Sequence, residues 1–535
     1  MIKLKRRSRT IVGVARAAAL VPAASDTAEP RPMSLSPAEL NAAPPLVFTT
    51  RVMDEIMHTI GSRPAESGGP LGGSRGGTLM ESFWLDETAR MNGAQYYPDV
   101  DAVNQLMREQ WNPRGTNLLG FVHSHPAGFA RPSSTDCQYA GRIMDAIPEL
   151  RRFALPIVQT TPDTGSFGLH GWSAVRRGND VVVEGQSVVL RPAPSEPKPT
   201  EDPAWARVHE AYDLRAMSQS RFVSIGCGGA AAFLEDLARA GVGEFVLIDP
   251  DQVEPPNVGT QQTYLPDVGR SKAKVIGERL LRVNPKSRVW VVPERLEDLT
   301  DEAVGRLASG WLPGPTAHVP TATLLGAFTD DFHAQARVAR LGLHLGVPVL
   351  AATVYREGRG VEVTFAAPGV TPACIRCALR SRYTAYLECG FTNDVTSHGT
   401  PYSATMRLNA LKMPIALGIL HTVSPVADPD HPGTQRHRRF LEAVAHRNLA
   451  LVSLDPDIGE SLGLGLFDDL SSLDPKGRLP VDSTLWLEQL PDHPDNGYPQ
   501  CPECGGSGDL RESISAFYDT SDTPLTYGDL RRRIA

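Results

Sequence analysis

The chain has 535 residues, a length that predicts two to four domains, because a single core of that size is rare. Hydrophobic residues make up 41% and charged residues 21%, as in ordinary globular proteins, and no apolar run is long enough to span a membrane. The formal net charge of −8 gives no support for nucleic-acid binding through bulk charge. We therefore expect neither nucleic acid nor membrane as a partner.

Residues 1–45 are rich in Pro, Ala and Arg and are expected to form a disordered N-terminal extension. Their basic start and the Ala/Val-rich stretch after it imitate a secretory signal, but Arg16 interrupts the apolar part. An alternative is that translation begins at Met33. The interrupted signal, together with the ATP chemistry inferred below, predicts a cytoplasmic protein.

Two folded regions follow, separated by a Pro-rich, charged stretch at 193–204 that is typical of a linker. In the first, at 46–192, apolar patterns predict strands at 46–49, 78–85, 118–122, 167–170 and 181–183 and helices near 51–60 and 99–110. In the second, at 205–535, an alternation of strand, glycine, helix and strand begins at Arg221 and predicts a parallel α/β sheet.

The segment GFVHSHPAGFARPSSTD contains two histidines, His123 and His125, that would face the same side of a strand. Asp136 would be a third metal ligand and would leave a fourth position open for water, as in catalytic zinc sites. A structural alternative is that Ser133 and Asp136 form a capping box that opens a helix around residues 136–144. The two histidines alone do not decide between these interpretations.

Together with Glu66, which follows an amphipathic helix, this segment resembles the JAB/JAMM metallopeptidase family. The family pattern is a glutamate near a glycine-rich strand, then His-x-His-Pro, seven residues and Ser-x-x-Asp, and the segment matches it in full. The resemblance implies a cytidine-deaminase-like α/β fold and catalytic Zn²⁺ held by His123, His125 and Asp136. It also implies that Glu66 moves a proton from the zinc-bound water to the leaving amine, and that Ser133 donates a hydrogen bond to the oxyanion. Without the downstream motif, Glu66 would be taken for a solvated loop carboxylate.

The second region opens with a strand, a glycine turn, a helix and another strand that ends at Asp249. Gly226-x-Gly228-x-x-Ala231 fits a dinucleotide-binding fold with Asp249 on a ribose, so a dehydrogenase is one alternative. Three later features argue against a dehydrogenase: Lys272 at a helix start, Asp330 at another strand end, and two Cys-x-x-Cys pairs.

These features resemble the activating-enzyme superfamily of ThiF- and MoeB-like adenylyltransferases and ubiquitin-activating enzymes, over about residues 205–425. The resemblance implies a Rossmann-like domain, ATP and Mg²⁺ as cofactors, and a homodimer. It implies a nucleotide loop at Gly226, Gly228 and Gly229, and a ribose ligand at Asp249. It also implies that Asn257 lies near the phosphates, that Lys272 contacts them, and that Asp330 holds magnesium.

One position departs from the family pattern. Thr260 stands where the family usually has arginine, which removes a fixed positive charge from the ATP site. Arg207, Arg215 and Arg270 are candidates to replace that charge.

The seven cysteines include two pairs that lie more than a hundred residues apart. This spacing favours a closed structural Cys₄ zinc site, made by Cys374, Cys377, Cys501 and Cys504, over two redox pairs.

Cys389 lies where many members of the family carry a cysteine on a crossing loop; it would accept an acyl group as a thioester or carry sulfur, unless it is an inert packed thiol. The helix expected at 403–420 is apolar all round, as in a core or a dimer interface.

The sequence therefore predicts one chain that both processes and activates a ubiquitin-like protein. The leading hypothesis is a prokaryotic conjugation pathway, with antiviral defence as its setting and a conjugating enzyme as a further partner. One alternative is a sulfur-carrier protein that becomes a thiocarboxylate; another is an inactive scaffold, which Thr260 keeps open for the second domain.

Overall fold

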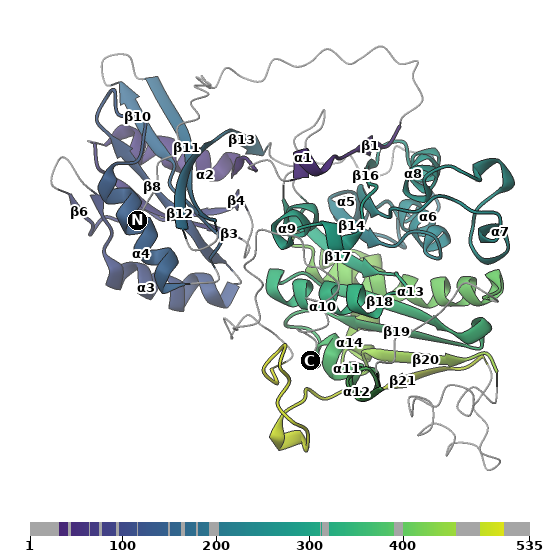
Figure 1. Ribbon diagram of the computed structural model, residues 1–535. Helices are drawn as coiled ribbons and strands as arrows, with labels where there is room; N and C mark the ends of the chain where they lie inside the picture. Colours follow the sequence, from purple (N-terminus) through teal and green to yellow (C-terminus); the bar gives the residue numbers. More distant parts are fainter. Residues whose placement is uncertain are drawn as a thin grey trace.

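The computed structural model contains two α/β domains (Figure 1). It describes residues 31–40, 44–63, 65–73, 78–91, 96–114, 116–147, 150–161, 166–177, 180–191, 203–310, 312, 320–389, 400–455 and 482–507. In Figure 1 the first domain is coloured purple to blue and the second teal to green, except that residues 33–40, in dark purple, lie on the second domain; the last described segment is yellow.

A seven-stranded mixed sheet forms the centre of the first domain, in the order β10-β11-β9-β8-β3-β5 with β12 on β11. Its strands are β3 (Gly68–Gly73), β5 (Ser82–Phe83), β8 (Asn117–His125), β9 (Arg152–Ala154), β10 (Ile157–Thr161), β11 (Ser166–Arg177) and β12 (Asp180–Gln186). A smaller sheet contains β13 (Val188–Arg191), β2 (Leu46–Thr49) and β4 (Leu79–Met80), and a hairpin pairs β6 (Arg90–Met91) with β7 (Tyr96–Tyr97). The helices are α2 (Thr50–His58), α3 (Val100–Leu106) and α4 (Ser134–Ala146).

Two of the expected elements of this domain differ from the structure. The single strand expected at 78–85 is two short strands, because β4 pairs with β2 whereas β5 pairs with β3 in the other sheet. The helix expected at 99–110 is α-helical only in α3, after which the backbone widens into a π-helical turn, η2 (Met107–Trp111). The buried strand expected before the histidines extends through both of them in β8.

The second domain is built on a nine-stranded sheet in the order β1-β16-β15-β14-β17-β18-β19-β20-β21. In this order, the six neighbouring strands β1, β16, β15, β14, β17 and β18 run parallel to one another. The pairings of β18 with β19, β19 with β20 and β20 with β21 are antiparallel. The strands of this sheet are β1 (Met33–Ser34), β14 (Ser220–Ile225), β15 (Glu244–Ile248), β16 (Arg288–Val292), β17 (Ala322–Ala327), β18 (Val349–Tyr355), β19 (Gly360–Ala366), β20 (Leu449–Ser453) and β21 (Thr484–Leu487). The central strands β14, β15 and β17 are buried along their whole length because helices cover both faces of the sheet (Figure 1).

The helices of the second domain begin near the N-terminus with α1 (Pro37–Leu40) and continue after the linker. They are α5 (Leu214–Ser218), α6 (Ala231–Arg239), α7 (Asn257–Thr260), α8 (Lys272–Val283), α9 (Asp301–Ser309), α10 (Phe332–Leu345), α11 (Ile375–Ala378), α12 (Arg380–Cys389), α13 (Tyr402–Val423) and α14 (Pro432–Val444). The helix expected at 403–420 is α13, and Ile415, Leu417, Ile419 and Leu420 on it belong to a core cluster with β14, β15 and α6.

Part of the segment expected to be a disordered extension lies on the second domain. Met33 and Ser34 of β1 pair with Trp290 and Val291 of β16, and Leu35 N–H donates to the Val291 carbonyl at 2.9 Å. Leu35 and Leu40 are buried in the core of that domain. The first domain thus follows a strand that is part of the second domain's sheet, as Figure 1 shows beside β16.

A salt bridge joins the two domains. The Arg152 guanidinium of β9 lies 2.6 Å from the Glu302 carboxylate of α9. Burial would raise the pKa of Glu302, but Arg152, together with Arg177 and Arg151, lowers it by more. Within the described part of the chain, no helix has both the length and the apolar character needed to cross a bilayer.

Candidate metal and nucleotide sites

The end of β8 and the first turn of α4 bring three side chains together: His123, His125 and Asp136, here called the metal triad. The two Nε2 atoms of the histidines are 2.8 Å apart. The Asp136 carboxylate oxygens lie 3.4 Å from His123 Nε2 and 3.3 Å from His125 Nε2. All three side chains are buried.

These distances fit a zinc ion. Ligand atoms about 2.0 Å from a tetrahedral zinc are about 3.3 Å from one another, so the two carboxylate contacts have the required spacing and the two nitrogens are slightly closer. The donor set of two imidazoles and one carboxylate is one that zinc accepts in catalytic sites with an open position.

Neighbouring groups fix the orientation of both histidine rings. His125 Nδ1 donates to the Phe129 carbonyl at 3.2 Å, which leaves Nε2 free for a metal. The Tyr96 ring stacks on the His123 ring at 5.5 Å between centroids, and the Tyr96 hydroxyl donates to Asp86. The Tyr96 ring thus holds the His123 ring, and the Phe129 carbonyl holds the His125 ring.

Glu66 lies opposite the metal triad, immediately before β3. Its side chain is buried, and one of its carboxylate oxygens and the two histidine ring nitrogens are within 4.8 Å of one another. Its Oε2 atom is buried without a hydrogen-bond partner, and its backbone has a φ of 71°, in the left-handed region. A buried, unpaired oxygen and a strained backbone are features that functional sites carry at a cost in stability.

The pKa values of the Glu66 and Asp136 carboxylates are shifted in opposite directions. Burial raises the pKa of Glu66, although the two histidines act to lower it. Burial would also raise the pKa of Asp136, but hydrogen bonds from His123 and His125 outweigh it and hold the pKa well below its usual range. Asp136 is thus held as an anion, whereas Glu66 is the carboxylate that takes up a proton more readily.

Ser133 is the N-cap of α4. Its hydroxyl accepts from the Asp136 backbone N–H at 3.2 Å, and its own N–H donates to Asp136 Oδ2 at 2.6 Å. The capping box and the third metal ligand, which were alternatives in the sequence, are therefore compatible in one arrangement.

In the second domain, residues 226–229 form a turn between β14 and α6, here called the nucleotide turn. Gly226 has a φ of 80°, and a Cβ there would lie 2.8 Å from the Phe328 carbonyl. A Cβ on Gly228 would lie 2.3 Å from the side-chain oxygen of Gln261. Gly226 requires glycine, because its backbone is in the left-handed region and a side chain there would meet backbone atoms, whereas a side chain at Gly228 would displace only the end of the Gln261 side chain.

Asp249, at the end of β15, holds this turn. Its two carboxylate oxygens accept from the backbone N–H groups of Cys227 and Asp251, at 2.8 and 2.9 Å. Burial raises its pKa, and these two hydrogen bonds act in the opposite direction.

Lys272 is the first residue of α8, and its Nζ donates to Asp251 Oδ2 at 3.0 Å. Asn257 opens α7, and its side-chain oxygen accepts from the Glu254 N–H at 2.8 Å. Asp330 follows β17, and burial raises its pKa, with Asp331 and Asp251 acting in the same direction. The carboxyl edge of the parallel strands thus carries several acidic side chains and one lysine that is already paired.

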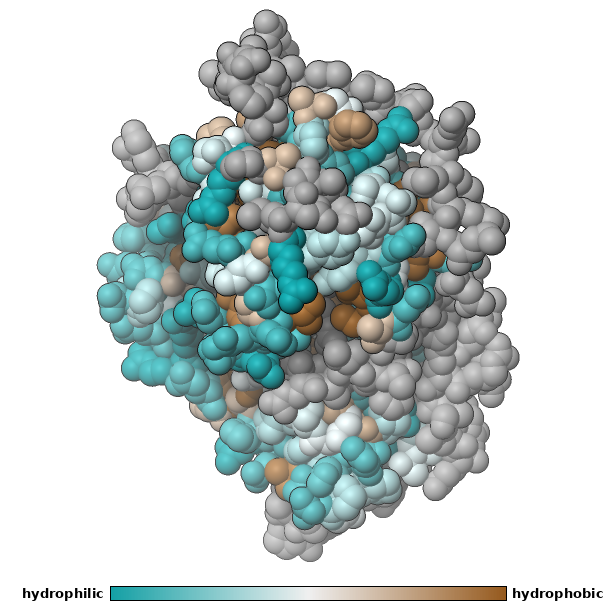
Figure 2. Space-filling model, turned by 90° about the vertical axis from the view of Figure 1, so that its left-hand side faces the viewer, coloured by the Kyte–Doolittle hydropathy of each residue, from teal (hydrophilic) through white to brown (hydrophobic). Residues whose placement is uncertain are grey.

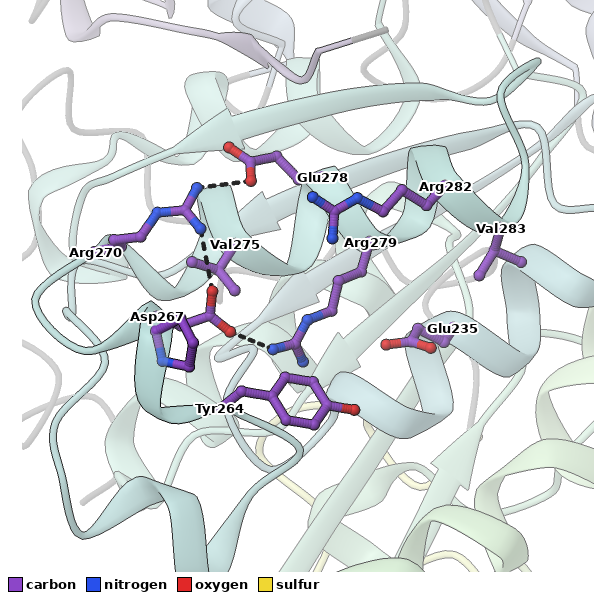
Figure 3. Close-up of a pocket in the computed structure, with 10 residues that line it drawn as sticks. Glu235, Tyr264, Asp267, Arg270, Val275, Glu278, Arg279, Arg282 and Val283 are labelled. Atoms are coloured by element: carbon purple, nitrogen blue, oxygen red, sulfur yellow. Dashed lines mark hydrogen bonds and ion pairs between the residues drawn. The ribbon is translucent and has the colours of Figure 1, made fainter. Parts of the chain in front are cut away.

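The arginine candidates for the charge missing at Thr260 do not approach these residues. Arg270 is paired with Asp267 at 3.1 Å and with Glu278 at 2.6 Å. Figure 3 shows these contacts at the wall of a surface pocket of about 540 Å³, which also contains the Tyr264 ring and the Arg279 guanidinium. For Arg207 and Arg215, the described part of the chain contains no side-chain contact with the nucleotide turn.

The four cysteines expected to bind structural zinc are brought together and buried. Cys374 Sγ lies 3.5 Å from Cys377 Sγ and 3.9 Å from Cys501 Sγ, and the sulfurs of Cys377 and Cys504 are 3.6 Å apart. Sulfur ligands about 2.3 Å from a tetrahedral zinc are about 3.8 Å apart, so the cluster fits the ion. The cluster ties the segment 482–507 to α11. Cys389 ends α12, but its side chain lies outside the described residues.

Three side chains that shape the nucleotide site were not predicted from the sequence. Asp251 is the partner of Lys272, and its position two residues after Asp249 was the available signal. Asn409 and Thr405, both on α13, donate to the carbonyls of Gly229 and Thr260 at 3.0 and 3.1 Å. Nothing in the local sequence indicates those two contacts, because each joins residues more than a hundred positions apart.

Two protein families match separate parts of the chain. Residues 50–170 match the family described as prokaryotic homologs of the JAB domain, and residues 202–436 match the ThiF family. The chain is a fusion of a JAB domain and a ThiF domain. The expected order of the two domains is confirmed, and so is the α/β fold with a Rossmann-like activating-enzyme domain.

Curated relatives match short stretches of the JAB–ThiF chain. The tRNA threonylcarbamoyladenosine dehydratase of Escherichia coli is 37% identical over 91 residues, which are 17% of this chain and 34% of the relative. The sulfur carrier protein adenylyltransferase of Thermus thermophilus is 38% identical over 82 residues, 15% of this chain and 30% of the relative. The ATP-dependent ubiquitin transferase-like protein Cap2 of Pseudomonas aeruginosa is 28% identical over 119 residues, 19% of this chain and 22% of the relative. The chain thus spans about a third or less of the length of these relatives.

Among solved structures, the crystal structure of Escherichia coli MccB with MccA is 18% identical and covers 47% of this chain and 68% of its own, with a TM-score of 0.33. At this score the likeness carries no inference about chemistry. Figure 2, which faces the JAB side of the molecule, shows a largely hydrophilic surface with a few separate apolar residues.

Proposed function

We propose that the JAB–ThiF chain hydrolyses a peptide or isopeptide bond at the C-terminus of a ubiquitin-like protein and adenylates the carboxylate that this exposes. The observation that carries the proposal is the convergence of Glu66 with the metal triad, in a chain whose second domain has a nucleotide turn and a lysine at a helix start. Zinc, ATP and Mg²⁺ are the cofactors that these sites would use.

In the JAB domain, His123, His125 and Asp136 would hold Zn²⁺. When bound, zinc lowers the pKa of a water ligand to near neutrality and polarises a carbonyl oxygen. Glu66 would take the proton of the attacking water on its unpaired Oε2 atom and return it to the leaving amine. Ser133 accepts a backbone hydrogen bond, so its own hydroxyl proton remains free to be donated to the developing oxyanion.

In the ThiF domain, the substrate carboxylate would attack the α-phosphate of ATP. The new bond joins a carboxylate oxygen to phosphorus, the bond to the β-phosphate breaks, and pyrophosphate leaves. Asp249 would bind the ribose, Asn257 would lie near the phosphates, and Lys272 would turn from Asp251 to the phosphates. Asp330 would hold Mg²⁺, which neutralises charge on the phosphate oxygens.

The two reactions are chemically consecutive. Hydrolysis after a C-terminal residue releases a carboxylate, and adenylation consumes a carboxylate. A chain that contains both sites converts an extended precursor into an acyl-adenylate without a second enzyme.

Two fates of the adenylate are supported by different relatives. The similarity to a protein named ATP-dependent ubiquitin transferase-like protein Cap2 supports conjugation. To this version we add, as proposals, transfer to Cys389, a conjugating enzyme as partner, and defence as the setting. The similarity to a sulfur carrier protein adenylyltransferase supports the second candidate, in which the adenylate becomes a thiocarboxylate. Homodimerisation and a cytoplasmic location belong to both versions of the proposal.

The test uses the full chain with zinc, MgATP and a ubiquitin-like protein that carries a short C-terminal extension. We expect release of the extension, followed by ATP–pyrophosphate exchange that depends on the trimmed protein. Exchange with the uncleaved precursor, or no cleavage by the zinc-loaded chain, would contradict the proposed sequence of reactions.

A second measurement separates the two fates. A reducible covalent adduct on the intact wild-type chain, absent from Cys389→Ser, is expected for conjugation, whereas exchange should be unchanged in that variant because the adenylate forms before a thiol is needed. If the wild-type chain forms no adduct, the sulfur-carrier version is favoured.

A further inference from the structure

Lys412, in the middle of α13, carries a buried amine without a counter-ion. Its side chain is 1% exposed, and its Nζ atom lies 3.9 Å from the ring centroid of Phe328 and 4.6 Å from that of Phe233. Among the described residues, no carboxylate or other hydrogen-bond acceptor contacts the amine. Burial lowers its pKa well below the ordinary value for lysine. An unpaired buried ammonium is costly, so the amine is held neutral.

The surroundings of Lys412 belong to the nucleotide site. Phe328 follows β17 and precedes Asp330 by two residues, and its carbonyl is the atom that a Cβ at Gly226 would meet. Phe233 lies on α6, which starts directly behind the nucleotide turn. One turn before Lys412 on α13, Asn409 donates to the Gly229 carbonyl at 3.0 Å. The amine thus lies behind the turn on which the phosphates of ATP would rest.

The nucleotide site is short of positive charge. Thr260 replaces an arginine of the family pattern, Lys272 is paired with Asp251, and Arg270 is paired with Asp267 and Glu278. ATP brings several negative charges to a place that already carries Asp249 and Asp330. A cation in a low-dielectric position behind the turn would attract them strongly, because a protein interior screens charge poorly.

We propose that Lys412 is a nucleotide-responsive cation, neutral in the empty site and protonated when the phosphates of ATP bind in front of it. The inference rests on the proposed binding of ATP and adds to it a residue and a proton. Lys412 touches neither substrate nor metal in this account, so it is a positioning residue whose charge holds the phosphates against the nucleotide turn.

The sign of the pH dependence follows from linkage. ATP binds better to the charged form of Lys412, so the pKa of Lys412 is higher in the ATP complex than in the ATP-free chain. At a pH between these two pKa values, ATP binding is accompanied by uptake of a proton. The gain in ATP affinity from Lys412 is complete below the pKa of the ATP-free chain and is lost as the pH rises through the pKa of the complex.

The other charged groups around α13 do not set the pKa of Lys412, which is lowered by burial and not by a neighbouring charge. Charged and titratable residues on the packed elements are Glu235, Asp236 and Arg239 on α6, Arg215 on α5, Tyr355 on β18, Glu362 on β19, Asp330 after β17, and Arg436, His437, Arg438, Arg439 and Glu442 on α14. Glu235 is paired with Gln262 and Arg239, and Glu362 with Arg382 and Tyr355.

The test is calorimetric titration of the full chain with MgATP in buffers of different ionisation enthalpy. At about pH 8.5 the phosphates of ATP no longer titrate, because their last pKa is near 6. We expect uptake of up to about one proton per ATP by the wild-type chain. Lys412→Met keeps the length and volume of the side chain; this variant should take up no proton and bind ATP about tenfold more weakly, as expected for the loss of one favourable charge. Arg407→Met is the matched control, because it removes a cation of the same helix that is paired with Asp482.

Each outcome has a distinct meaning. Proton uptake by the wild-type chain and by Arg407→Met, but not by Lys412→Met, supports the inference. ATP binding without proton uptake between about pH 7 and 10 overturns it while the proposed adenylation stands. Failure of the wild-type chain to bind ATP overturns the proposed function and the inference together. If Lys412→Met does not fold, the wild-type proton count still decides.

Discussion

Ser133 and Asp136 hold each other in place across the first turn of α4, through one hydrogen bond in each direction. The same pair caps a helix and positions a candidate metal ligand. Because the Asp136 carboxylate is held by a backbone N–H of Ser133, its position does not depend on the Ser133 hydroxyl. The hydroxyl can therefore be removed without removing the ligand.

This relationship predicts the effect of Ser133→Ala. Zinc should remain bound, and the helix should lose about 1 kcal/mol from its N-cap. Cleavage of a C-terminally extended ubiquitin-like protein should fall by about a hundredfold, because an oxyanion donor is lost. Ser133→Thr keeps the hydroxyl and should retain most of the activity. Equal rates for Ser133→Ala and the wild-type chain would remove Ser133 from the reaction.

Glu66→Gln should separate metal binding from catalysis. The amide has the same shape but cannot accept the proton, so cleavage should fall by about a hundredfold or more while zinc content is unchanged. Metal analysis and the rate of extension release are measured on the same sample. Glu55→Gln is a control on α2, where the partly exposed carboxylate pairs with Arg51. Full cleavage by Glu66→Gln would show that another group is the base.

Lys272→Ala should abolish the ATP–pyrophosphate exchange that the trimmed partner stimulates and leave cleavage intact. The loss should be severe, because Thr260 leaves the site without its usual arginine and the variant also leaves Asp251 unpaired. Lys274→Ala, two residues further along the exposed side of α8, is the matched control and should keep full exchange. Loss of cleavage in Lys272→Ala would instead mean that the two domains do not act independently.

Cys501→Ser should lose one zinc ion and destabilise the ThiF domain. Structural zinc supplies folding free energy, and without it the cluster would bury unpaired sulfur and hydroxyl groups. Cys227→Ala, another buried cysteine outside the cluster, should retain the wild-type zinc content. Two zinc ions per chain in Cys501→Ser, measured by elemental analysis, would count against a Cys₄ site.

Acid should weaken the packing of α13 against α14 through His437. Burial lowers the pKa of His437 to about 4, and the neighbouring His421 and Arg436 act in the same direction. Because the folded pKa is depressed, the unfolded chain binds the proton first, and stability is lost as the pH falls from the ordinary histidine pKa toward 4.

His437→Phe preserves the stacking on Tyr212 and His421 but cannot be protonated. The melting temperature of the wild-type chain should fall by at least about 2–4 °C more than that of the variant between pH 7 and 5. Parallel melting temperatures across this range would show that His437 does not titrate on unfolding.

Local patterns in the sequence were sufficient to predict both site motifs. His123, His125 and Asp136 come from one strand and the helix after it, and their match to the JAB/JAMM pattern predicted that they meet. The glycines of the nucleotide turn and Asp249 likewise lie within one strand–helix–strand unit. The parallel sheet was predicted for a similar reason, because a strand, a glycine turn, a helix and another strand follow one another from Arg221 onward.

Only the tertiary structure shows how groups that are distant along the chain reach these sites and which partners they already have. The placement of Glu66 against the metal triad depends on the register of β3 on β8, and the meeting of four cysteines depends on a segment that returns from residue 482 onward. The pairing of Lys272 with Asp251, and of Arg270 with Asp267 and Glu278, shows which charges are already engaged. The burial of Lys412 behind the nucleotide turn depends on how α13 crosses α6 and β17. A side chain's charge is written in the sequence, but its burial and its partners exist only after the chain has folded, because they are set by contacts between residues far apart along it.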